Sequence, residues 1–194
     1  MSARLTRPHL PRVLSLLLAL LTQLVAIPAT ARDDFNVRDV HTHLENGVYL
    51  LNATIDAKFS AEALEALENG VPLTIVIHFQ VRCVKAWLWE DSLLDQQRRY
   101  VIRYKPLADG YEVYPLPGEH GRRFVTREAA LRAFGELTDL ALINQDRLQP
   151  DTDYEVQIKV FLDIEALPLP LRPIAYLKPS WQLASRWSKW PLNR

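Results

Sequence analysis

This sequence has one cysteine, few glycines and no excess of positive or negative charge, and each of these features argues against a class of protein. The only cysteine is Cys83, so no disulfide forms within the chain and the fold depends on its apolar core. The six glycines are scattered and form no phosphate-binding loop. Basic and acidic residues number 23 each, which argues against nucleic acid as a partner, because such binding needs a basic excess.

Catalytic motifs are missing as well. Neither G-x-S-x-G nor S-x-x-K, the motifs of serine nucleophiles, occurs in the chain. The sequence therefore predicts no catalytic residue, no cofactor and no motif-based metal site. An enzyme is the less favoured interpretation but stays open, because a pair of catalytic carboxylates across a cleft leaves no pattern in one sequence.

The first 31 residues have the three parts of a secretory signal peptide. The start is positive and has no acidic residue, with Arg4, Arg7 and Arg12. A helical apolar segment, Val13 to Ile27, follows, and the small residues Ala29 and Ala31 then precede Arg32. This pattern predicts cleavage between Ala31 and Arg32.

Removal of the signal peptide would leave residues 32–194 as a single domain, a common size for one folding unit. The expected location is the periplasm or the medium outside the cell, without a stable transmembrane span after cleavage. The alternative is a retained inner-membrane anchor. A membrane-spanning helix needs about 20 apolar residues, however, and the run from Val13 to Ile27 is shorter.

Apolar and polar residues alternate through most of residues 35–194, which indicates antiparallel strands with one buried face. Ser60 and Thr126 are suitable N-caps for two short helices. The longest alternating run extends from Leu73 to Trp89, with a bulge or bend at Lys85. The pattern predicts helices over 61–68 and 127–137, and strands over 35–44, 48–59, 73–89, 98–105, 111–116, 122–125, 154–163 and 174–183.

The segment from Leu148 to Ile158 favours one arrangement of these strands. Leu148, Pro150 and Tyr154 lie in a stretch that resembles the L-x-P-x-T-x-Y-x-V-x-V pattern of fibronectin type III domains. In those domains the tyrosine hydroxyl bonds to upstream backbone and forms a tyrosine corner. The resemblance implies a mainly β fold, an immunoglobulin-like antiparallel β-sandwich with two short helices.

Several stretches, taken in order, also resemble a family of Gram-negative bacterial secreted proteins described as proline-rich signal-peptide proteins, whose domain has no known function. The resemblance implies a secreted or periplasmic protein. In that family the gene often lies beside a gene for a membrane sensor kinase, so such a kinase is the partner that the resemblance suggests. No activity, cofactor or site residue follows from it. The stretches are Ala66 to Leu73, Trp87 to Asp91, Tyr104 to Leu107, Leu162-Asp163, Leu167 to Leu171, and Trp181 to Trp187.

Two histidines are the strongest candidates for a metal site. His41 and His43 would lie on one face of a strand, about 7 Å apart at their α-carbons. A third ligand from elsewhere would complete a site, and His78, Asp39 or Asp56 could supply it. The alternative is a hydrated strand end, which is the favoured interpretation because no second spaced pair occurs.

Five tryptophans are candidates for contact with a partner. If their strands are neighbours, the rings would form one aromatic patch, a feature that anchors partners when it is exposed. The alternative is packing within the core. Trp187 and Trp190 are the better surface candidates, since they follow the last predicted strand. The full set is Trp87, Trp89, Trp181, Trp187 and Trp190.

These observations favour an exported, non-enzymatic envelope protein that binds another protein. The alternative is a periplasmic small-ligand binder or a hydrolytic enzyme whose site has no recognisable motif. The oligomeric state has no signature in the sequence.

We expect the mature chain to begin at Arg32, because the peptidase requires small side chains such as Ala29 and Ala31 just before the cleaved bond. N-terminal sequencing of protein from the envelope fraction measures this directly. Recovery of a chain that still begins at Met1 or Ser2 would contradict cleavage.

Overall fold

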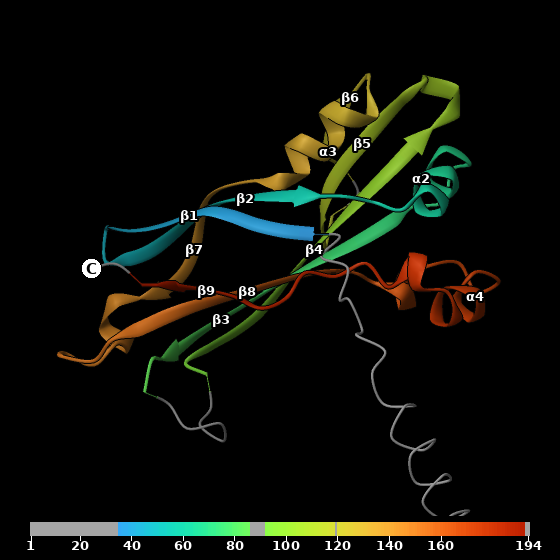
Figure 1. Ribbon diagram of the computed structural model, residues 1–194. Coiled ribbons are helices and arrows are strands. Elements are labelled where there is room, and N and C mark those ends of the chain that lie inside the picture. The colour runs from blue at the N-terminus through green and yellow to red at the C-terminus, as the bar shows by residue number, and fades with distance from the viewer. Residues whose placement is uncertain (1–34, 86–91, 119, 193–194) are drawn as a thin grey trace, which may run out of the picture. The chain divides into compact units, whose positions relative to one another are not determined.

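The computed structural model describes residues 35–85, 92–118 and 120–192, which form two antiparallel sheets and three short helices. One sheet has three strands in the order β1-β2-β7, and the other has six in the order β6-β5-β4-β3-β8-β9 (Figure 1). In chain order the elements are β1 (Phe35–Glu45), β2 (Val48–Ala57), α2 (Ala61–Glu68), β3 (Leu73–Cys83), β4 (Leu94–Lys105), β5 (Gly110–Leu116), β6 (Arg122–Phe124), α3 (Arg127–Gly135), β7 (Glu136–Asn144), β8 (Tyr154–Leu162), α4 (Arg172–Leu177) and β9 (Ser188–Pro191).

The hairpin of β1 and β2 follows from its turn residues. Asn46 and Gly47 have φ values of 49° and 78°, a backbone conformation that Asn and Gly adopt more readily than other residues. Glu45 therefore lies opposite Val48. The register brings Tyr49, Leu51 and Ile55 onto the buried face of β2.

Both outer strands of the three-stranded sheet carry a bulge at an aspartate with positive φ. Asp39 in β1 has φ 51°, and Asp139 in β7 has φ 49°. The β1–β2 register shifts between Arg38 and His41. The backbone amide of Asp139 donates to Asn52 Oδ1 of β2 at 2.7 Å. These irregular, charged edges disfavour pairing with a further strand.

Strand β3 occupies the interior of the six-stranded sheet and pairs antiparallel with both β4 and β8. Its first half is buried on both faces, since Thr74 and Val76 are buried as well as Ile75. Its second half keeps an open outer face, where His78 and Gln80 are partly exposed. Polar side chains of the neighbouring strands β4 and β8 therefore lie beside His78 and Gln80 on this face.

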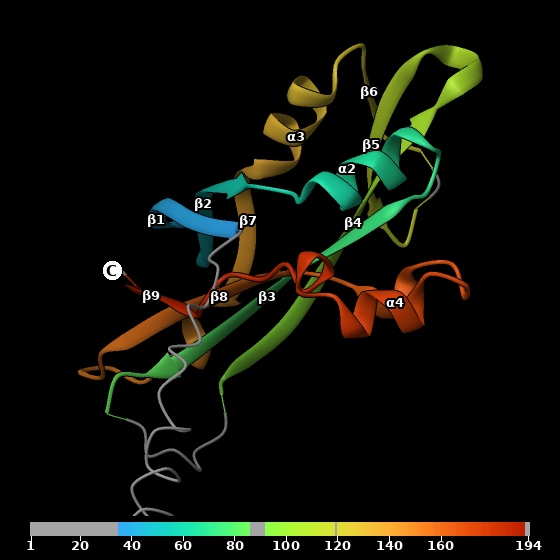
Figure 2. The same cartoon turned by 45° about the vertical axis from the view of Figure 1, so that its right-hand side comes forward.

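One hydrophobic core takes side chains from both sheets. Tyr49 and Leu51 come from the three-stranded sheet, and Ile75, Ile77 and Phe79 come from β3. Figure 2 shows α2 and α3 lying beside the sheets on the side where β4 and β5 extend. Leu67 of α2 and Phe134 of α3 are buried in the same core. Burial of this core stabilises the fold in place of disulfides, which a single cysteine cannot form within the chain.

The two predicted helices form with the expected caps. The Ser60 hydroxyl accepts from the Ala63 amide, and the Thr126 hydroxyl accepts from the Ala129 amide, each at 3.2 Å. No helix among the described residues is long and apolar enough to span a membrane.

Several predicted element positions differ from those in the structure, and β7 and β9 were not predicted. Residues 174–183 were expected to be a strand, but Arg172–Leu177 is the helix α4. Pro173 lies in its first turn, where a missing backbone N–H costs nothing. The predicted helix over 127–137 ends at Gly135, and strand β7 begins directly after it. The predicted strand 73–89 ends at Cys83, and residues 86–91 lie outside the described part of the chain.

The prediction of a mainly β fold is confirmed, with antiparallel sheets of three and six strands and few short helices. The described residues all belong to one compact unit, Arg32–Arg194. The open outer face of β3 and its neighbours is the part of this unit where the candidate site lies.

We expect Gly135→Ala to lower the free energy of unfolding by about 1–3 kcal/mol, measured by urea denaturation. A Cβ at Gly135 would lie 2.3 Å from the carbonyl oxygen of Ile55, and backbone cannot turn aside as a side chain can. The control is Glu136→Ala at the next, exposed position, which should change stability by less than about 0.5 kcal/mol. Equal stability of the two variants would contradict the close contact between α3 and β2.

Candidate functional site

Several predicted residues fall outside the described part of the chain. Ala29, Ala31 and Arg32, the residues of the predicted cleavage site, are among them, and so are Trp87 and Trp89. The aromatic candidates that the structure does place are Trp181, Trp187 and Trp190.

These three tryptophans do not form one surface patch. Trp181 is 5% exposed and belongs to the core, so the expectation of a partner-binding ring does not hold for it. Trp190 lies in β9 opposite Val156, a core residue of β8, and packs against the core. Its indole Nε1 is buried without a hydrogen-bond acceptor among the described residues. Removal of Trp190 would therefore disturb packing as well as any surface.

Trp187 is the tryptophan that the described structure leaves accessible. Its side chain is 37% exposed, and it immediately precedes β9. Its ring meets the ring of His78 edge to face, with centroids 4.9 Å apart and an interplanar angle of 61°. The contact joins the C-terminal edge of the six-stranded sheet to its central strand.

His78 is held by a carboxylate from the neighbouring strand. Its Nε2 lies 2.6 Å from Asp95 Oδ1, and Gln80 donates to Asp95 Oδ2 at 2.8 Å. The hydrogen bond from His78 lowers the pKa of Asp95, and the bond from Gln80 acts in the same direction against partial burial. The carboxylate therefore stays ionised and orients the imidazole beneath Trp187.

Strand register brings further polar groups around this pair. His78 lies opposite Gln97 of β4 and Lys159 of β8, while Gln80 lies opposite Asp95 and Gln157. Gln157 in turn lies opposite Lys189 of β9. Gln157 is buried. We call the accessible residues of this set the Trp187 surface, and its members are His78, Gln80, Asp95, Gln97, Lys159, Trp187 and Lys189.

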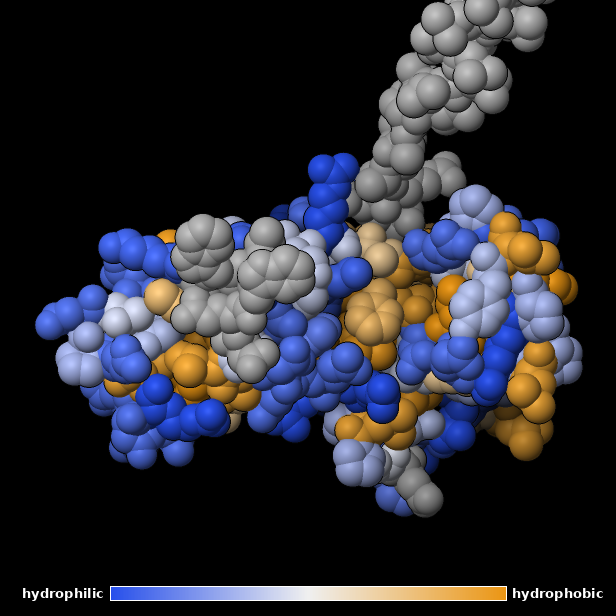
Figure 3. Space-filling model, turned by 90° about the horizontal axis from the view of Figure 1, so that it is seen from below, coloured by the Kyte–Doolittle hydropathy of each residue, from blue (hydrophilic) through white to orange (hydrophobic). Residues whose placement is uncertain are grey.

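The Trp187 surface combines an accessible indole with amide, imidazole, carboxylate and ammonium groups on one open sheet face. Figure 3 views the molecule from below Figure 1 and shows hydrophilic surface around separate hydrophobic patches. Such a surface suits hydrogen bonding to a partner around one aromatic anchor.

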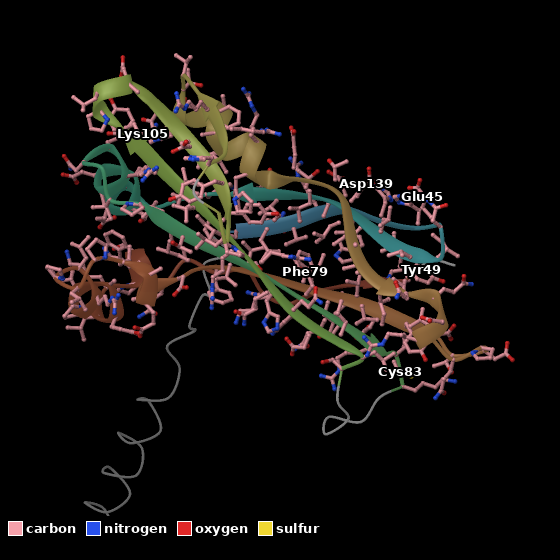
Figure 4. All side chains as sticks on the ribbon, turned by 180° about the vertical axis from the view of Figure 1, so that it is seen from behind. Glu45, Tyr49, Phe79, Cys83, Lys105 and Asp139 are labelled. Atoms are coloured by element: carbon pink, nitrogen blue, oxygen red, sulfur yellow. The ribbon has the colours of Figure 1, made fainter. Side chains whose placement is uncertain are left out.

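The two histidines considered as candidate metal ligands, His41 and His43, lie on one face of β1 without a third metal ligand beside them among the described residues. Thr42 between them is buried, so both lie on the opposite face of β1. His43 Nε2 is 3.7 Å from Asp139 and 3.9 Å from Glu45, two residues that Figure 4 labels close together. No group of three His, Cys, Asp or Glu residues suited to a metal occurs in 35–85, 92–118 and 120–192.

The proposed third ligands are engaged elsewhere. Asp56 accepts a hydrogen bond from Arg38 at 2.9 Å, and Asp39 lies 3.8 Å from the same guanidinium. His78 belongs to the other sheet and contacts Asp95.

Tyr154 lies at the start of β8 and is 7% exposed. Its hydroxyl accepts a hydrogen bond from the backbone amide of Gln149 at 3.0 Å. Leu148 packs against the core from the same connection, whereas Pro150 is exposed. These residues position the start of β8.

Sequence reasoning missed a buried carboxylate, Glu112 of β5. The residue is 2% exposed and binds Lys105 Nζ at 2.7 Å and Arg103 at 2.9 Å. Hydrogen bonds from Lys105 and then Arg103 lower its pKa against the opposing effect of burial. The sequence of β4 contained a sign of this carboxylate, because the basic residues Arg99, Arg103 and Lys105 occupy alternating positions on one face of the strand.

Comparison with known proteins gives one match. The model of the family described as Domain of unknown function (DUF4390) matches residues 32–191. Neither a curated protein nor a solved structure matches significantly.

We expect Glu112→Gln to destabilise the fold at neutral pH and to matter less in acid. Because the folded state lowers the pKa of Glu112 from its ordinary 4.5, the ionised group stabilises the fold above that value. The stabilisation is lost as the pH falls through the lowered pKa. Urea denaturation at pH 7 should show a deficit of about 1–3 kcal/mol.

The same measurement near pH 3 should show a smaller deficit. Glu136→Gln at an exposed position is the matched control and should equal the parent at both pH values. A deficit that stays constant between pH 7 and pH 3 would contradict an ionised, stabilising Glu112.

Proposed function

This chain belongs to the DUF4390 family, whose model spans residues 32–191, and we propose that it is an exported, non-enzymatic protein of the cell envelope that binds another protein. The binding surface in this proposal is the Trp187 surface on the six-stranded sheet. The observation that carries it is the accessible Trp187 ring, seated on a histidine that Asp95 holds in place.

Export is supported by the N-terminal sequence. Positive charge, a short apolar run and the small residues Ala29 and Ala31 occur in the order that the secretion machinery requires. We propose cleavage before Arg32, which coincides with the first residue that the family model matches. A periplasmic or secreted location follows from export, and the family resemblance to Gram-negative secreted proteins agrees with it.

We also propose that the two sheets form an immunoglobulin-like sandwich. The order β1-β2-β7 in one sheet, with β4-β3-β8-β9 within the other, supports this, because strands A, B and E oppose C′, C, F and G in such domains. The bond between Gln149 and Tyr154 at the start of β8 agrees with a tyrosine corner on strand F. Strands β5 and β6 would then be an extension beyond C′.

Binding through this surface is supported by its physical character. Aromatic rings at protein interfaces supply large contact area at little entropic cost, and they dominate binding energy when polar groups surround them. Asp95 restrains His78 before any partner arrives, so the ring of Trp187 has a fixed support. The partner that we propose, from the family's gene neighbourhood, is the sensory part of a membrane kinase.

The proposal predicts that one envelope protein crosslinks to this chain in its native cell and that Trp187→Ala abolishes the capture. Crosslinking of the tagged protein followed by mass spectrometry measures both. Tyr176→Ala is the matched control, since Tyr176 is an aromatic side chain on α4 that is 50% exposed. The Tyr176→Ala variant should crosslink to the same envelope protein in the same amount as the parent.

Trp190→Ala is unsuitable as a test because Trp190 packs against the core. Capture that survives Trp187→Ala would refute this surface. Absence of any specific partner would favour the alternative of a small-ligand binder or a hydrolytic enzyme.

A further inference from the structure

Three cations surround the buried carboxylate of Glu112, in the part of the six-stranded sheet that β4, β5 and β6 form. Arg103 and Lys105 of β4 bind its Oε2 at 2.9 and 2.7 Å, and Arg123 of β6 lies 4.0 Å from its Oε1. Strand register explains the convergence, because Glu112 lies opposite both Arg103 and Arg123. Figure 4 labels Lys105 at the opposite end of the sheet from Cys83.

The cluster has more positive charge and more donors than Glu112 can satisfy. One carboxylate neutralises one of three cations. Two guanidinium groups and an ammonium also offer many more N–H donors than two carboxylate oxygens can accept. Arg103 Nε is buried and has no acceptor among the described residues. Arg103 itself does not line the adjoining space, but Lys105 and Arg123 do, so their remaining donors can reach a ligand there.

A hollow of about 180 Å³ adjoins the cluster. Lys105, Glu112 and Arg123 line it on the side of the cluster, so two of the three cations face the open space. Tyr111, Phe124 and Val125 form part of the remaining wall. Asp109 lines it too, and its carboxylate accepts a hydrogen bond from the Tyr104 hydroxyl at 2.9 Å. The volume suits a small oxyanion rather than a drug-sized ligand, which fills about 300 Å³ or more.

Exposed apolar side chains stand beside this hollow. Val125 is 85% exposed and lines it, and Leu107 is fully exposed in the turn that begins one residue after Lys105. Cations next to exposed aliphatic groups suit a ligand that has an anionic head and an apolar body. Guanidinium and ammonium groups together are the usual donors to phosphate.

We propose that Lys105 and Arg123, supported by Arg103, form a binding site for a phosphate group. The phosphate is bound by charge-assisted hydrogen bonds without covalent change, and Glu112 competes with it for the same donors. A phospholipid headgroup or a free phosphate could supply the group. The site is separate from the Trp187 surface and does not depend on it.

Calorimetric titration of the purified protein with inorganic phosphate tests the free form. Flotation with phosphatidylcholine vesicles, with and without phosphatidylglycerol, tests the lipid form. Binding to vesicles alone would assign the headgroup, and binding to inorganic phosphate alone would assign the free ion. Absence of binding in both assays would overturn the proposal.

The variant Lys105→Gln/Arg123→Gln should weaken the observed binding by roughly tenfold or more, since hydrogen bonds to charged groups are worth that much each. The matched control is Lys159→Gln/Lys189→Gln, which removes the same charge from the Trp187 surface. It should bind as the parent does. Equal loss in both variants, or loss in neither, would overturn a localised site.

Glu112→Gln separates a binding site from a purely structural ion cluster. Removal of the competing carboxylate should tighten phosphate binding severalfold in protein whose circular dichroism shows the native fold. Unchanged or weaker binding by folded Glu112→Gln would contradict the competition. If that variant unfolds, the Lys105→Gln/Arg123→Gln pair still decides the question, because neither residue is buried and Arg103 still binds Glu112 in it. Its circular dichroism is checked in the same way.

Discussion

The pairing of β3 with β4 on one side and β8 on the other is the constraint on which the rest of this structure depends. It places Ile75, Ile77 and Phe79 in the core shared with the three-stranded sheet. With no disulfide available, burial of such side chains supplies the main stabilisation. The same register leaves His78 and Gln80 on the opposite face. The pairing of β3 therefore determines both which side chains enter the core and which polar groups remain at the surface.

That polar face contains two different local environments. Around His78 the groups are mixed in charge, and Asp95 satisfies the imidazole and one amide together. Around Glu112 three cations share one carboxylate, so positive charge is in surplus. A chain with equal numbers of acidic and basic residues thus acquires a locally basic region through strand pairing alone. Overall net charge says little about such a region.

Local signals in the sequence predicted much of the fold. Alternation predicted most strands, and Ser60 and Thr126 predicted two helix starts, because these effects act within a few residues. The prediction failed for α4, since a strand was expected over 174–183 and Pro173 instead occupies the first turn of a helix. It also missed β7, whose apolar positions are interrupted at Asp139 by a bulge. An apolar pattern that a bulge interrupts does not match the two-residue period by which a strand is recognised in sequence.

The sequence by itself determined the export-like N-terminus, the mainly β character and the residues that turn or cap the chain, since each depends on neighbours along the chain. Only the tertiary structure decided which residues meet across strands. Trp181, Trp187 and Trp190 look alike in sequence, yet Trp181 is buried, Trp187 is accessible, and Trp190 in β9 is partly buried against the core. Glu112 and Arg123 likewise meet only through the register of β5 and β6. Cross-strand register depends on long-range packing, and short-range patterns do not encode it.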